Sequence, residues 1–307
     1  MEFSSLQIFL AVAQEGGVSK AAQKLNYVQS NVTARIRKLE EELGVSLFHR
    51  RPRGMSLTPA GELLLQYAQK ALRLMEEAQK AVSDQAEVGG KLNLGSLGST
   101  AGVRLPGLLA AYYQQYPAVE INVATGRLHD LMEQVIDYKL DGAFVTGPVN
   151  RPELVQQEAF WEELVLVTQA GTGPPPNEQY GNALVCPQGQ CHYRTRMEYW
   201  LREEGLVPYR TMEFDTLEAI LGCVATGMGV SMLPRSVVEV SAYKADLAAH
   251  DLPPELAWIS IVFIRRKDGL NTKAMEALCG LMAQRLDQPG WRPPKKKTTL
   301  APEDECA

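Results

Sequence analysis

The first sixty residues alternate apolar and polar positions with a helical period that glycines interrupt. Apolar residues at three- and four-residue spacing are Leu6, Phe9, Leu10 and Ala13. This spacing predicts an amphipathic helix, which ends at Gly16-Gly17. Ser19 stands where it can cap a second, short helix that continues to Leu25. The sequence therefore predicts two short helices within the first 25 residues.

A third helix and a hairpin follow a turn at Asn26-Tyr27. The apolar positions of this helix, four, three and four residues apart, are Val32, Ile36, Leu39 and Leu43. Its other face carries Arg35, Arg37 and Lys38. After Gly44 come two short strand-like pieces around a basic turn with Pro52 and Gly54. Three short helices, the second and third closely joined, and this hairpin predict a winged helix-turn-helix over residues 1–58.

Thr58 and Pro59 begin a long helical segment, with Thr58 as its cap and Pro59 at the first helical position. The segment runs to about Gln85 and stops before Gly89-Gly90. Its heptad-spaced residues are Leu64, Tyr67, Ala71, Leu74, Ala78 and Ala81. One interpretation is a helix packed on its own domain. Because no neighbouring segment is long enough to cover the heptad face, we favour a linker helix over residues 59–88 that dimerises through Leu64, Tyr67, Ala71, Leu74 and Ala78.

From Lys91 onward, short apolar runs alternate with helical segments. The expected strands are 92–97, 119–124, 142–146, 164–168, 183–186, 230–233 and 259–264, and the expected helices are 101–115, 127–139, 193–204, 216–227 and 272–287. This alternation is typical of a parallel α/β architecture, and the Gly- and Pro-rich stretch 171–176 suggests two lobes rather than one sheet. The polar residues 292–307 contain a run of three lysines, and we expect them to form a disordered tail.

The composition is that of a folded protein with two or three domains. Hydrophobic residues make up 45% and charged residues 22% of the chain. No apolar run approaches the about 18 residues of a membrane span, and no basic segment precedes the apolar stretch Leu6–Ala13. An odd, scattered set of cysteines indicates reduced thiols, so we expect a cytoplasmic location. These cysteines are Cys186, Cys191, Cys223, Cys279 and Cys306.

The net charge of −5 conceals an asymmetry along the chain. Residues 1–60 hold 8 Lys and Arg against 5 Asp and Glu, a net of +3. The remaining residues hold 23 against 31, a net of −8, and the two values sum to −5. A basic N-terminal part on an acidic body confines affinity for polyanions to one end of the chain.

Residues 19–61 resemble the DNA-binding signature of the LysR family of bacterial transcriptional regulators over nearly its whole length. The matching positions are Ser19, Ala21-Ala22, Leu25, Gln29-Ser30, Val32-Thr33, Ile36, Leu39-Glu40, Leu43-Gly44, Leu47-Phe48, Arg50, Arg53, Leu57-Thr58 and Ala60-Gly61. The chain departs from the family at Val28, where Ser or Thr is usual. This departure points to a third helix that begins at Ser30 or Asn31.

A recognition helix in the major groove meets base edges near its N-terminus. The amides of Gln29 and Asn31 suit adenine, and Arg35, one turn deeper, suits guanine. Arg37 and Lys38 are expected at phosphate or solvent, and the wing arginines along the backbone or in the minor groove. A merely solvated helix face is the alternative for these polar positions. The expected DNA-binding residues are Ser19, Gln29, Ser30, Asn31, Thr33, Arg35, Arg37, Arg50, Arg51 and Arg53.

Residues 92–290 resemble the effector domain of the same family, which is shaped like a periplasmic binding protein with two lobes and a cleft. The resemblance implies an effector-binding domain over residues 91–291 whose chain crosses between the lobes near 163 and returns near 264. Lobe I would then comprise 91–162 and 265–291, and lobe II would comprise 163–264.

Ligands of such folds lie beyond the carboxyl ends of strands. The loops there supply the expected effector-binding residues Ser99, Thr100, Thr125, Thr146, Cys191, Tyr193, Asp215 and Thr216. Ser99 and Thr100 precede the expected helix 101–115, where hydroxyls and free N–H groups favour a carboxylate or phosphate. A plain helix cap is the alternative. An amine without a carboxylate would need an acidic partner, for which Asp215 and Glu218 are the nearest candidates.

Two segments also resemble regulators of putrescine and related amine or semialdehyde catabolism. These are Cys191–Trp200 and Gly98–Leu109. The family resemblance further implies a homotetramer of two dimers, an interrupted inverted repeat in double-stranded DNA, a bend that changes when a small-molecule effector binds, and RNA polymerase as a partner. It implies no cofactor, no metal and no membrane.

Two other classes of protein share features with this sequence. An enzyme could use Cys191-His192 as nucleophile and base, but adjacent side chains point in different directions. A metal site of Cys186, Cys191 and His192 would have only three ligands at irregular spacing. A cytoplasmic solute-binding protein would share the fold of residues 92–290, but not the N-terminal DNA-binding module. We therefore expect a non-enzymatic regulator.

Overall fold

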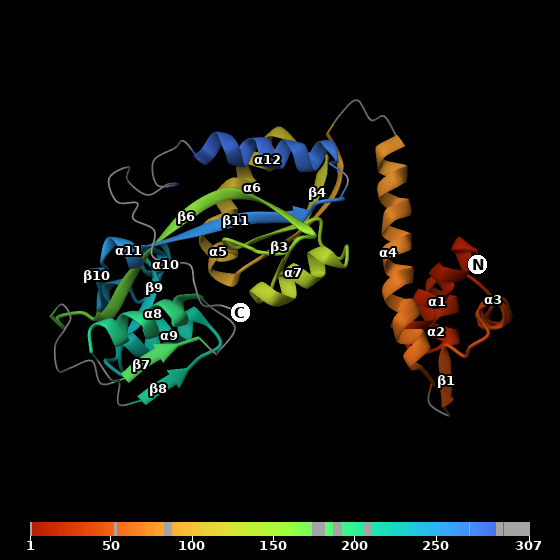
Figure 1. Cartoon of the computed structure of the whole chain (residues 1–307), viewed down its shortest axis with the longest axis horizontal. Helices are drawn as coiled ribbons and strands as arrows, with labels where there is room; N and C mark the ends of the chain where they lie inside the picture. The colour runs from red at the N-terminus through yellow and green to blue at the C-terminus, as the bar shows by residue number, and fades with distance from the viewer. Residues whose placement is uncertain are drawn as a thin grey trace. The chain divides into compact units, whose positions relative to one another are not determined.

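The computed structural model describes residues 2–51, 54–82, 88–173, 182–186, 192–205, 210–269, 271–286 and residue 291. The chain divides into two compact units, residues 1–86 and residues 87–307 (Figure 1). Each unit has its own hydrophobic core and is described by itself. Within the described ranges, no helix is both long and apolar enough to cross a membrane.

The first unit contains three short helices, a hairpin and a long helix, in the predicted order. They are α1 (Phe3–Glu15), α2 (Val18–Lys24), α3 (Gln29–Leu43), β1 (Phe48–Arg51), β2 (Gly54–Leu57) and α4 (Pro59–Val82). Gly16 and Gly44 end α1 and α3 with φ values of 67° and 70°, a conformation that glycine adopts without strain. Fully buried side chains join the short helices, among them Phe9, Val12, Val32, Ile36 and Leu39.

Helix α3 begins at Gln29, so the expected start at Ser30 or Asn31 is wrong. Val28 is the N-cap residue, with extended backbone and no side-chain cap. Its carbonyl accepts hydrogen bonds from the N–H groups of Asn31 at 3.0 Å and Val32 at 3.3 Å. A valine side chain offers no hydrogen-bond acceptor, but the helix start does not depend on one because the backbone supplies these bonds.

The junction between the hairpin and α4 depends on Thr58. Its hydroxyl donates to the carbonyl of Ser46 at 2.7 Å and accepts from the N–H of Gly61 at 3.0 Å. A Cβ on Gly61 would lie 2.1 Å from the carbonyl oxygen of Leu47, so only glycine permits this approach. The predicted cap at Thr58 and helical position of Pro59 are confirmed.

The second unit consists of strands and helices in alternation. They are β3 (Gly90–Ser96), α5 (Gly98–Val103), α6 (Leu105–Gln115), β4 (Val119–Thr125), α7 (Leu128–Ile136), β5 (Gly142–Thr146), β6 (Leu154–Gln169), β7 (Asn182–Val185), α8 (His192–Glu203), β8 (Arg210–Glu213), α9 (Leu217–Ala225), β9 (Ser231–Pro234), α10 (Arg235–Val240), a 3-10 turn (Lys244–Asp246), β10 (Leu247–Asp251), α11 (Pro254–Ala257), β11 (Trp258–Arg266) and α12 (Lys273–Leu286).

The main sheet of this unit is mixed, not parallel as the sequence predicted. Its strand order is β10-β6-β11-β5-β3-β4, and β9 also pairs with β6. Strand β3 runs parallel to β4 and β5, whereas β11 runs antiparallel to both β5 and β6. The antiparallel pairs arise because the chain leaves the first lobe along β6 and returns along β11 (Figure 1). A second, two-stranded parallel sheet joins β7 and β8.

The two lobes are defined here by what flanks β6 and β11. Lobe I holds β3–β5, α5–α7 and α12, and lobe II holds β7–β10 and α8–α10 (Figure 1). Strand β6 pairs with β11 as far as Glu163, and from Leu164 it pairs with β9 and β10. Strand β11 pairs with β5 from Ile261 onward. The sequence predicted that the chain crosses from lobe I to lobe II near residue 163 and returns near residue 264.

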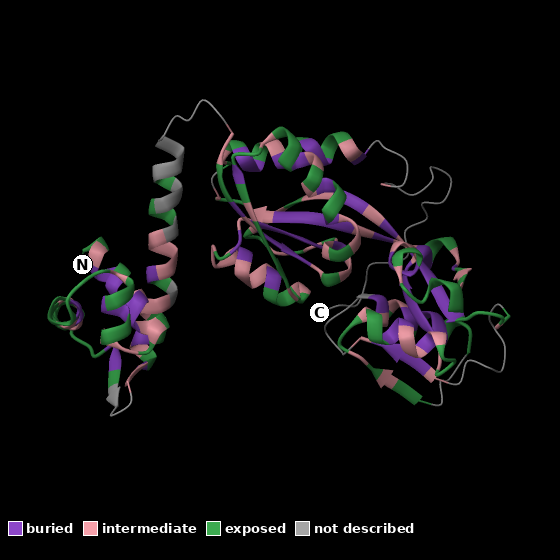
Figure 2. Ribbon diagram, turned by 180° about the vertical axis from the view of Figure 1, so that it is seen from behind, coloured by how far each residue is buried: buried purple, intermediate pink, exposed green. Residues whose placement is uncertain are grey.

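Alternating side chains of lobe I build two cores, one on each face of its sheet. Phe144 and Phe263 pack with residues of α6 and α12, whereas Ala143, Val145 and Ile264 pack with Leu131 and Val135 of α7. Figure 2 shows buried residues along the strands and exposed residues on the outer helix surfaces. The sheet therefore forms the middle layer of lobe I and presents the carboxyl ends of β3, β4 and β5 together.

Candidate DNA-binding face and effector cleft

The N-terminal turn of α3 is open to solvent. Gln29, Ser30 and Asn31 are exposed, and Thr33 is half-buried with its hydroxyl donating to the carbonyl of Gln29 at 2.9 Å. Ser19 on α2 is also exposed and borders a hollow that Thr33 lines. Amide and hydroxyl groups therefore gather at one end of α3, where base edges are met in the major groove.

The cations of α3 lie on two different flanks. Arg37 is exposed, whereas Arg35 is half-buried and forms an ion pair with Glu2. Lys38 donates to the other carboxylate oxygen of Glu2 at 3.1 Å. These hydrogen bonds from Lys38 and Arg35 hold the pKa of Glu2 below its ordinary value. Arg35, expected at a guanine, thus contacts the chain's own carboxylate.

The wing hairpin is fixed to the end of α1. Met55 donates its N–H to the carbonyl of Gly16 at 2.8 Å, and a Cβ on Gly54 would lie 2.6 Å from the same oxygen. Strand β1 pairs with β2 in antiparallel register from Phe48 to Arg51. The side chains of Arg50 and Arg51 and the whole of Arg53 lie outside the described residues, so their expected DNA contacts stay predictions.

Helix α4 carries one apolar face on its own domain and a second that is open. Leu64, Leu65, Ala71 and Leu72 pack partly against the core of the first unit, and Ala68 is buried there. Among the residues of the helix whose side chains are described, the exposed apolar ones are Leu63, Tyr67, Leu74, Met75 and Ala78. Of the expected dimer residues, Tyr67, Leu74 and Ala78 therefore lie on the open face, while Leu64 and Ala71 face the core.

A cleft of about 750 Å³ lies between the two lobes of the second unit. Lobe I lines it with Ser99, Thr125, Arg127, Asp130 and Thr146. Lobe II lines it with Tyr193, Asp215, Thr216, Glu218, Ser241 and Tyr243. Six of the expected effector residues therefore meet around one cavity of a size typical for small-ligand sites. Cys191 lies outside the described residues, so its expected role stays a prediction.

Thr100 is the exception among the expected residues. It is buried, it is absent from the lining of the cleft, and its hydroxyl has no hydrogen-bond partner. The expected helix 101–115 is two helices, since Pro106 at the start of α6 cannot continue the backbone bonding of α5. Ser99 and Thr100 thus lie inside the six-residue helix α5 rather than before a long helix, so little helix dipole supports an anion there.

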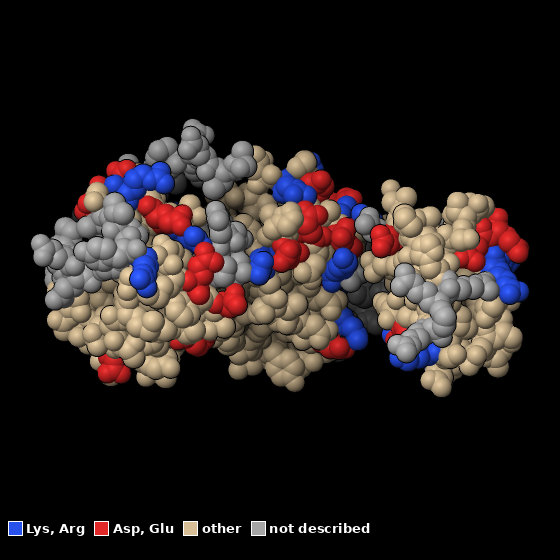
Figure 3. Space-filling model, turned by 90° about the horizontal axis from the view of Figure 1, so that it is seen from below, with Lys and Arg blue, Asp and Glu red and all other residues tan. Residues whose placement is uncertain are grey.

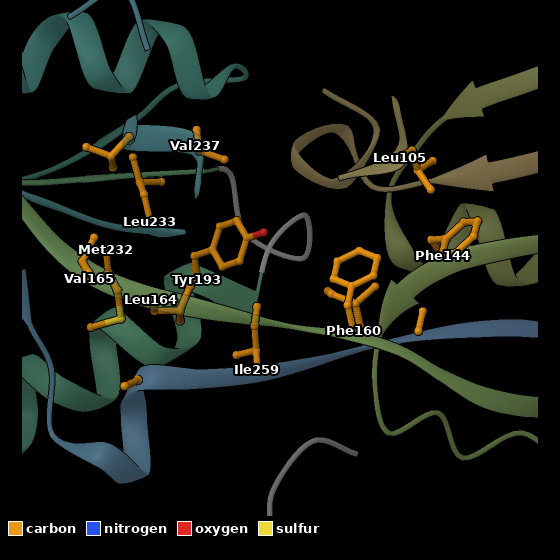
Figure 4. Close-up of a cluster of buried hydrophobic side chains, with 14 of the residues drawn as sticks. Leu105, Phe144, Phe160, Leu164, Val165, Tyr193, Met232, Leu233, Val237 and Ile259 are labelled. Atoms are coloured by element: carbon orange, nitrogen blue, oxygen red, sulfur yellow. The ribbon is translucent and has the colours of Figure 1, made fainter. Parts of the chain in front are cut away.

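Ser99 and Tyr193 join the two lobes across the cleft. Their hydroxyl oxygens lie 2.8 Å apart, one on α5 and the other on α8. Figure 4 shows the Tyr193 hydroxyl directed from the cluster around Met232 and Leu233 toward the side where Phe160 lies. Buried Glu162 of β6 accepts hydrogen bonds from Arg104 at 3.0 Å and from Ser236 at 2.9 Å, which ties both lobes to β6.

The charges and apolar groups of the cleft point to an amphipathic ligand. Among the described lining residues, Arg127 supplies one guanidinium, and Asp130, Asp215 and Glu218 supply three carboxylates. Val240 and Tyr243 line it as well, with 67% and 41% of their surfaces exposed. Exposed apolar side chains in a concave site are suited to contact with a ligand's carbon skeleton.

Several lining residues were not among those predicted from the sequence. Arg127 and Asp130 follow Thr125 at the end of β4, close to a strand end where ligand-binding residues were expected. Val240, Ser241 and Tyr243 come from α10 and the turn after it, which the apolar pattern did not predict. A helix of six residues is too short to show a helical period.

The alternative chemistry of cysteine and histidine finds no assembled site. Among the described residues, no three His, Cys, Asp or Glu side chains are grouped to hold a metal ion. Cys186 lines the cleft, while Cys191 and the side chain of His192 are outside the described residues.

Figure 3 shows acidic and basic side chains side by side, rather than separated by sign, on the face that it presents.

Comparisons with known proteins identify the family of both units. Residues 3–62 match the model for the bacterial regulatory helix-turn-helix protein, lysR family, and residues 85–287 match the LysR substrate binding domain. The transcriptional regulator GltR of Bacillus subtilis is 43% identical over 280 residues, which cover 90% of this chain and 94% of that protein. The regulator SoxR of an Arthrobacter strain is 42% identical over 276 residues, with 90% and 94% coverage.

Solved structures share the fold. A full-length OxyR variant from Pseudomonas aeruginosa superposes with a TM-score of 0.72 at 23% identity, covering 93% of this chain and 95% of that one. Full-length CbnR complexed with its target DNA gives a TM-score of 0.69 at 22% identity, with 92% and 99% coverage. On the matched domains and the curated relatives, this chain belongs to the LysR family and is a DNA-binding transcriptional regulator with a substrate-binding effector domain.

Proposed function

We propose that this regulator acts in the cytoplasm as a sensor of a small metabolite that carries an amino group, and that it has no enzymatic activity. The metabolite binds between the lobes and changes how the N-terminal unit holds or bends DNA. The observation that carries this proposal is the cleft of about 750 Å³, lined from both lobes and bridged by Ser99 and Tyr193.

The charges of the lining favour the amino group. Asp215 and Glu218 on lobe II and Asp130 on lobe I are exposed carboxylates around the cavity. An ammonium group there would be paired, whereas a dianion would face three carboxylates, which among the described lining residues Arg127 alone would offset. A carboxylate at the other end of the ligand would be held by Arg127 and by the hydroxyl of Ser99. Amino acids, and semialdehydes that keep an amino group, fit this description.

A sensor needs a ligand that prefers one arrangement of the lobes, because equal affinity for two states shifts neither. Ser99 and Tyr193 give such a preference a physical basis, since their hydrogen bond exists only when α5 and α8 are close. A ligand that bonds either hydroxyl changes the free energy of closure directly.

DNA recognition is assigned to the N-terminal turn of α3 and to the wing. Gln29, Ser30, Asn31 and Thr33 read base edges, and Arg37 with the wing arginines contacts the backbone. Two copies joined through the open face of α4 would place two such helices on an interrupted inverted repeat. Two dimers form the tetramer, which contacts RNA polymerase.

The first experiment is a gel shift on the DNA upstream of the gene that encodes this chain, followed by genome-wide mapping of bound sites. Specific binding there supports the regulator. Binding with no preference over random DNA, together with turnover of a metabolite by the pure protein, would favour an enzyme instead. The genes beside the bound sites then indicate which metabolites to test. Calorimetry on the full chain ranks these metabolites by affinity.

A further inference from the structure

One carboxylate of the first unit gathers two cations of the recognition helix. Glu2 lies just before α1, and its two oxygens bond Arg35 and Lys38 separately. Arg35 and Lys38 are three residues apart on α3, so they are neighbours on one flank of the helix. The arrangement is a cradle in which a guanidinium and an ammonium converge on a single oxyanion.

The cradle is open to solvent and is not needed to hold α1 against α3. The side chains of Arg35, Lys38 and Glu2 are 35%, 54% and 51% exposed. The two helices are already joined by buried contacts that include Phe9 and Ile36. Exposed ion pairs contribute little to stability because water and salt compete for both partners. Glu2 can therefore leave this position at small cost.

A phosphodiester oxygen suits the same two cations. Guanidinium and ammonium groups are the usual partners of DNA phosphates, and charge-assisted bonds to phosphate resemble those to carboxylate. Arg35 and Lys38 belong to the helix that lies in the major groove, where the flanks of the helix face the strand backbones. The carboxylate of Glu2 therefore offers these cations the same kind of charge-assisted bond that a phosphate oxygen would offer.

We propose that Arg35 and Lys38 form a backbone-phosphate site of the recognition helix, and that Glu2 occupies this site until DNA displaces it. Glu2 thus acts as an internal competitor that weakens binding to every duplex alike. This assigns Arg35 to the phosphate backbone rather than to a guanine. It also places Lys38, which was expected at phosphate or solvent, at the same phosphate as Arg35.

The test uses the full chain and a random-sequence duplex, with affinity measured by fluorescence anisotropy at several salt concentrations. Glu2→Gln removes the competing charge and should tighten binding by roughly two- to fivefold, as expected for loss of an exposed ion pair. The matched control is Glu15→Gln, which removes the same charge from the same unit and also breaks an exposed pair, with Lys24 at 2.8 Å. Glu15→Gln should tighten binding less, because only the general charge changes.

Variants of the cations provide a second measurement. Lys38→Gln and Arg35→Gln should each lower the slope of log affinity against log salt by about 0.9, as expected for one lost phosphate contact. Their thermal midpoints should stay close to that of the unaltered chain, since the pairs are exposed. Both effects should appear equally on random DNA and on an operator.

Three results would overturn the site. The first is a Glu2→Gln variant that binds the random duplex no tighter than the Glu15→Gln variant does, because Glu2 would then not compete with DNA. The second is an unchanged salt slope in Lys38→Gln. The third is an Arg35→Gln variant that loses its preference for the operator but keeps its affinity for random DNA, because Arg35 would then contact a base edge rather than a phosphate.

Discussion

The hydroxyl oxygens of Ser99 and Tyr193 lie 2.8 Å apart, and this one hydrogen bond joins helix α5 of lobe I to helix α8 of lobe II. Tyr193 is otherwise buried, with 6% of its surface exposed, so its ring holds the hydroxyl in a fixed place. Ser99 lies on the lining of the cleft. The pair therefore couples the occupancy of the cleft to the distance between the lobes.

Ser99→Ala should weaken effector binding while leaving the ligand-free protein's affinity for its operator unchanged. Loss of one hydrogen bond at about 1 kcal/mol corresponds to roughly fivefold in Kd. Calorimetry with the metabolite that the mapped genes suggest, and anisotropy on the operator, measure the two affinities. Unaltered metabolite affinity would mean that Ser99 only bonds Tyr193 and does not reach the ligand.

Thr100→Val is the matched control for Ser99→Ala, because the two hydroxyls are neighbours with different surroundings. The Thr100 hydroxyl is buried without a partner, so an apolar side chain of the same shape should leave the free energy of unfolding unchanged or raise it. Effector affinity should also be unchanged, since Thr100 does not line the cleft. Thermal unfolding and the same calorimetry decide this. A clear loss of affinity would place the Thr100 hydroxyl at the ligand.

The contrast between these two residues shows what the sequence can predict about the cleft. The carboxyl ends of the predicted strands coincide with the cleft, since Ser99, Thr125, Thr146 and Asp215 all line it. The sequence does not separate Ser99 from Thr100, because which of the two faces the cleft depends on the orientation of the six-residue helix α5. Short irregular elements such as the turn after α10 carry no periodic signal, so Tyr243 could not be found.

The first unit was easier to predict because its helices are long relative to their period and its cap chemistry is local. Val32, Ile36 and Leu39 fixed the buried side of α3, and Thr58 fixed the start of α4. The heptad of α4 was ambiguous, because a helix with two apolar faces satisfies the same spacing. Which face is open depends on where the rest of the unit packs, and a pattern of spacing does not contain that information.

Leu74→Glu should abolish dimers, since Leu74 is 50% exposed on α4 and a charge buried without a partner in an interface is costly. Sedimentation of the variant gives the oligomeric state. Met228→Glu, at an exposed apolar residue of the second unit, controls for the added charge and should keep the dimer. Operator affinity should fall far more than affinity for a single half-site. A Leu74→Glu dimer of normal strength would show that the open face of α4 is not the dimer interface.

Asn31→Ala should reduce sequence preference rather than general DNA affinity. A lost amide contact to a base edge costs about 1–3 kcal/mol on the operator and little on random DNA. Arg37→Ala should instead weaken both kinds of duplex alike and lower the salt slope by about one unit. Parallel titrations on the two duplexes separate these outcomes. Equal losses on both duplexes for Asn31→Ala would remove Asn31 from the base-reading set.

His250 should make the stability of the second unit depend on pH. Its ring nitrogen Nε2 lies 2.8 Å from the hydroxyl of buried Thr168, and burial lowers the pKa of the imidazole below its ordinary value. The unfolded chain therefore binds the proton more readily than the folded one. The stabilising contribution is complete above the unfolded pKa of about 6.5 and is lost as the pH falls through the lower folded value.

The thermal midpoint of the full chain should consequently fall between pH 7.5 and pH 5.5, and His250→Gln should reduce this fall. His129→Gln is the matched control, because His129 is exposed on α7 and its replacement should leave the pH dependence of the midpoint as it is. Scanning calorimetry of the three proteins at both pH values provides the comparison. If the thermal midpoints of the His250→Gln variant and the unaltered chain fall by the same amount on acidification, the proton uptake that destabilises this unit occurs at another group.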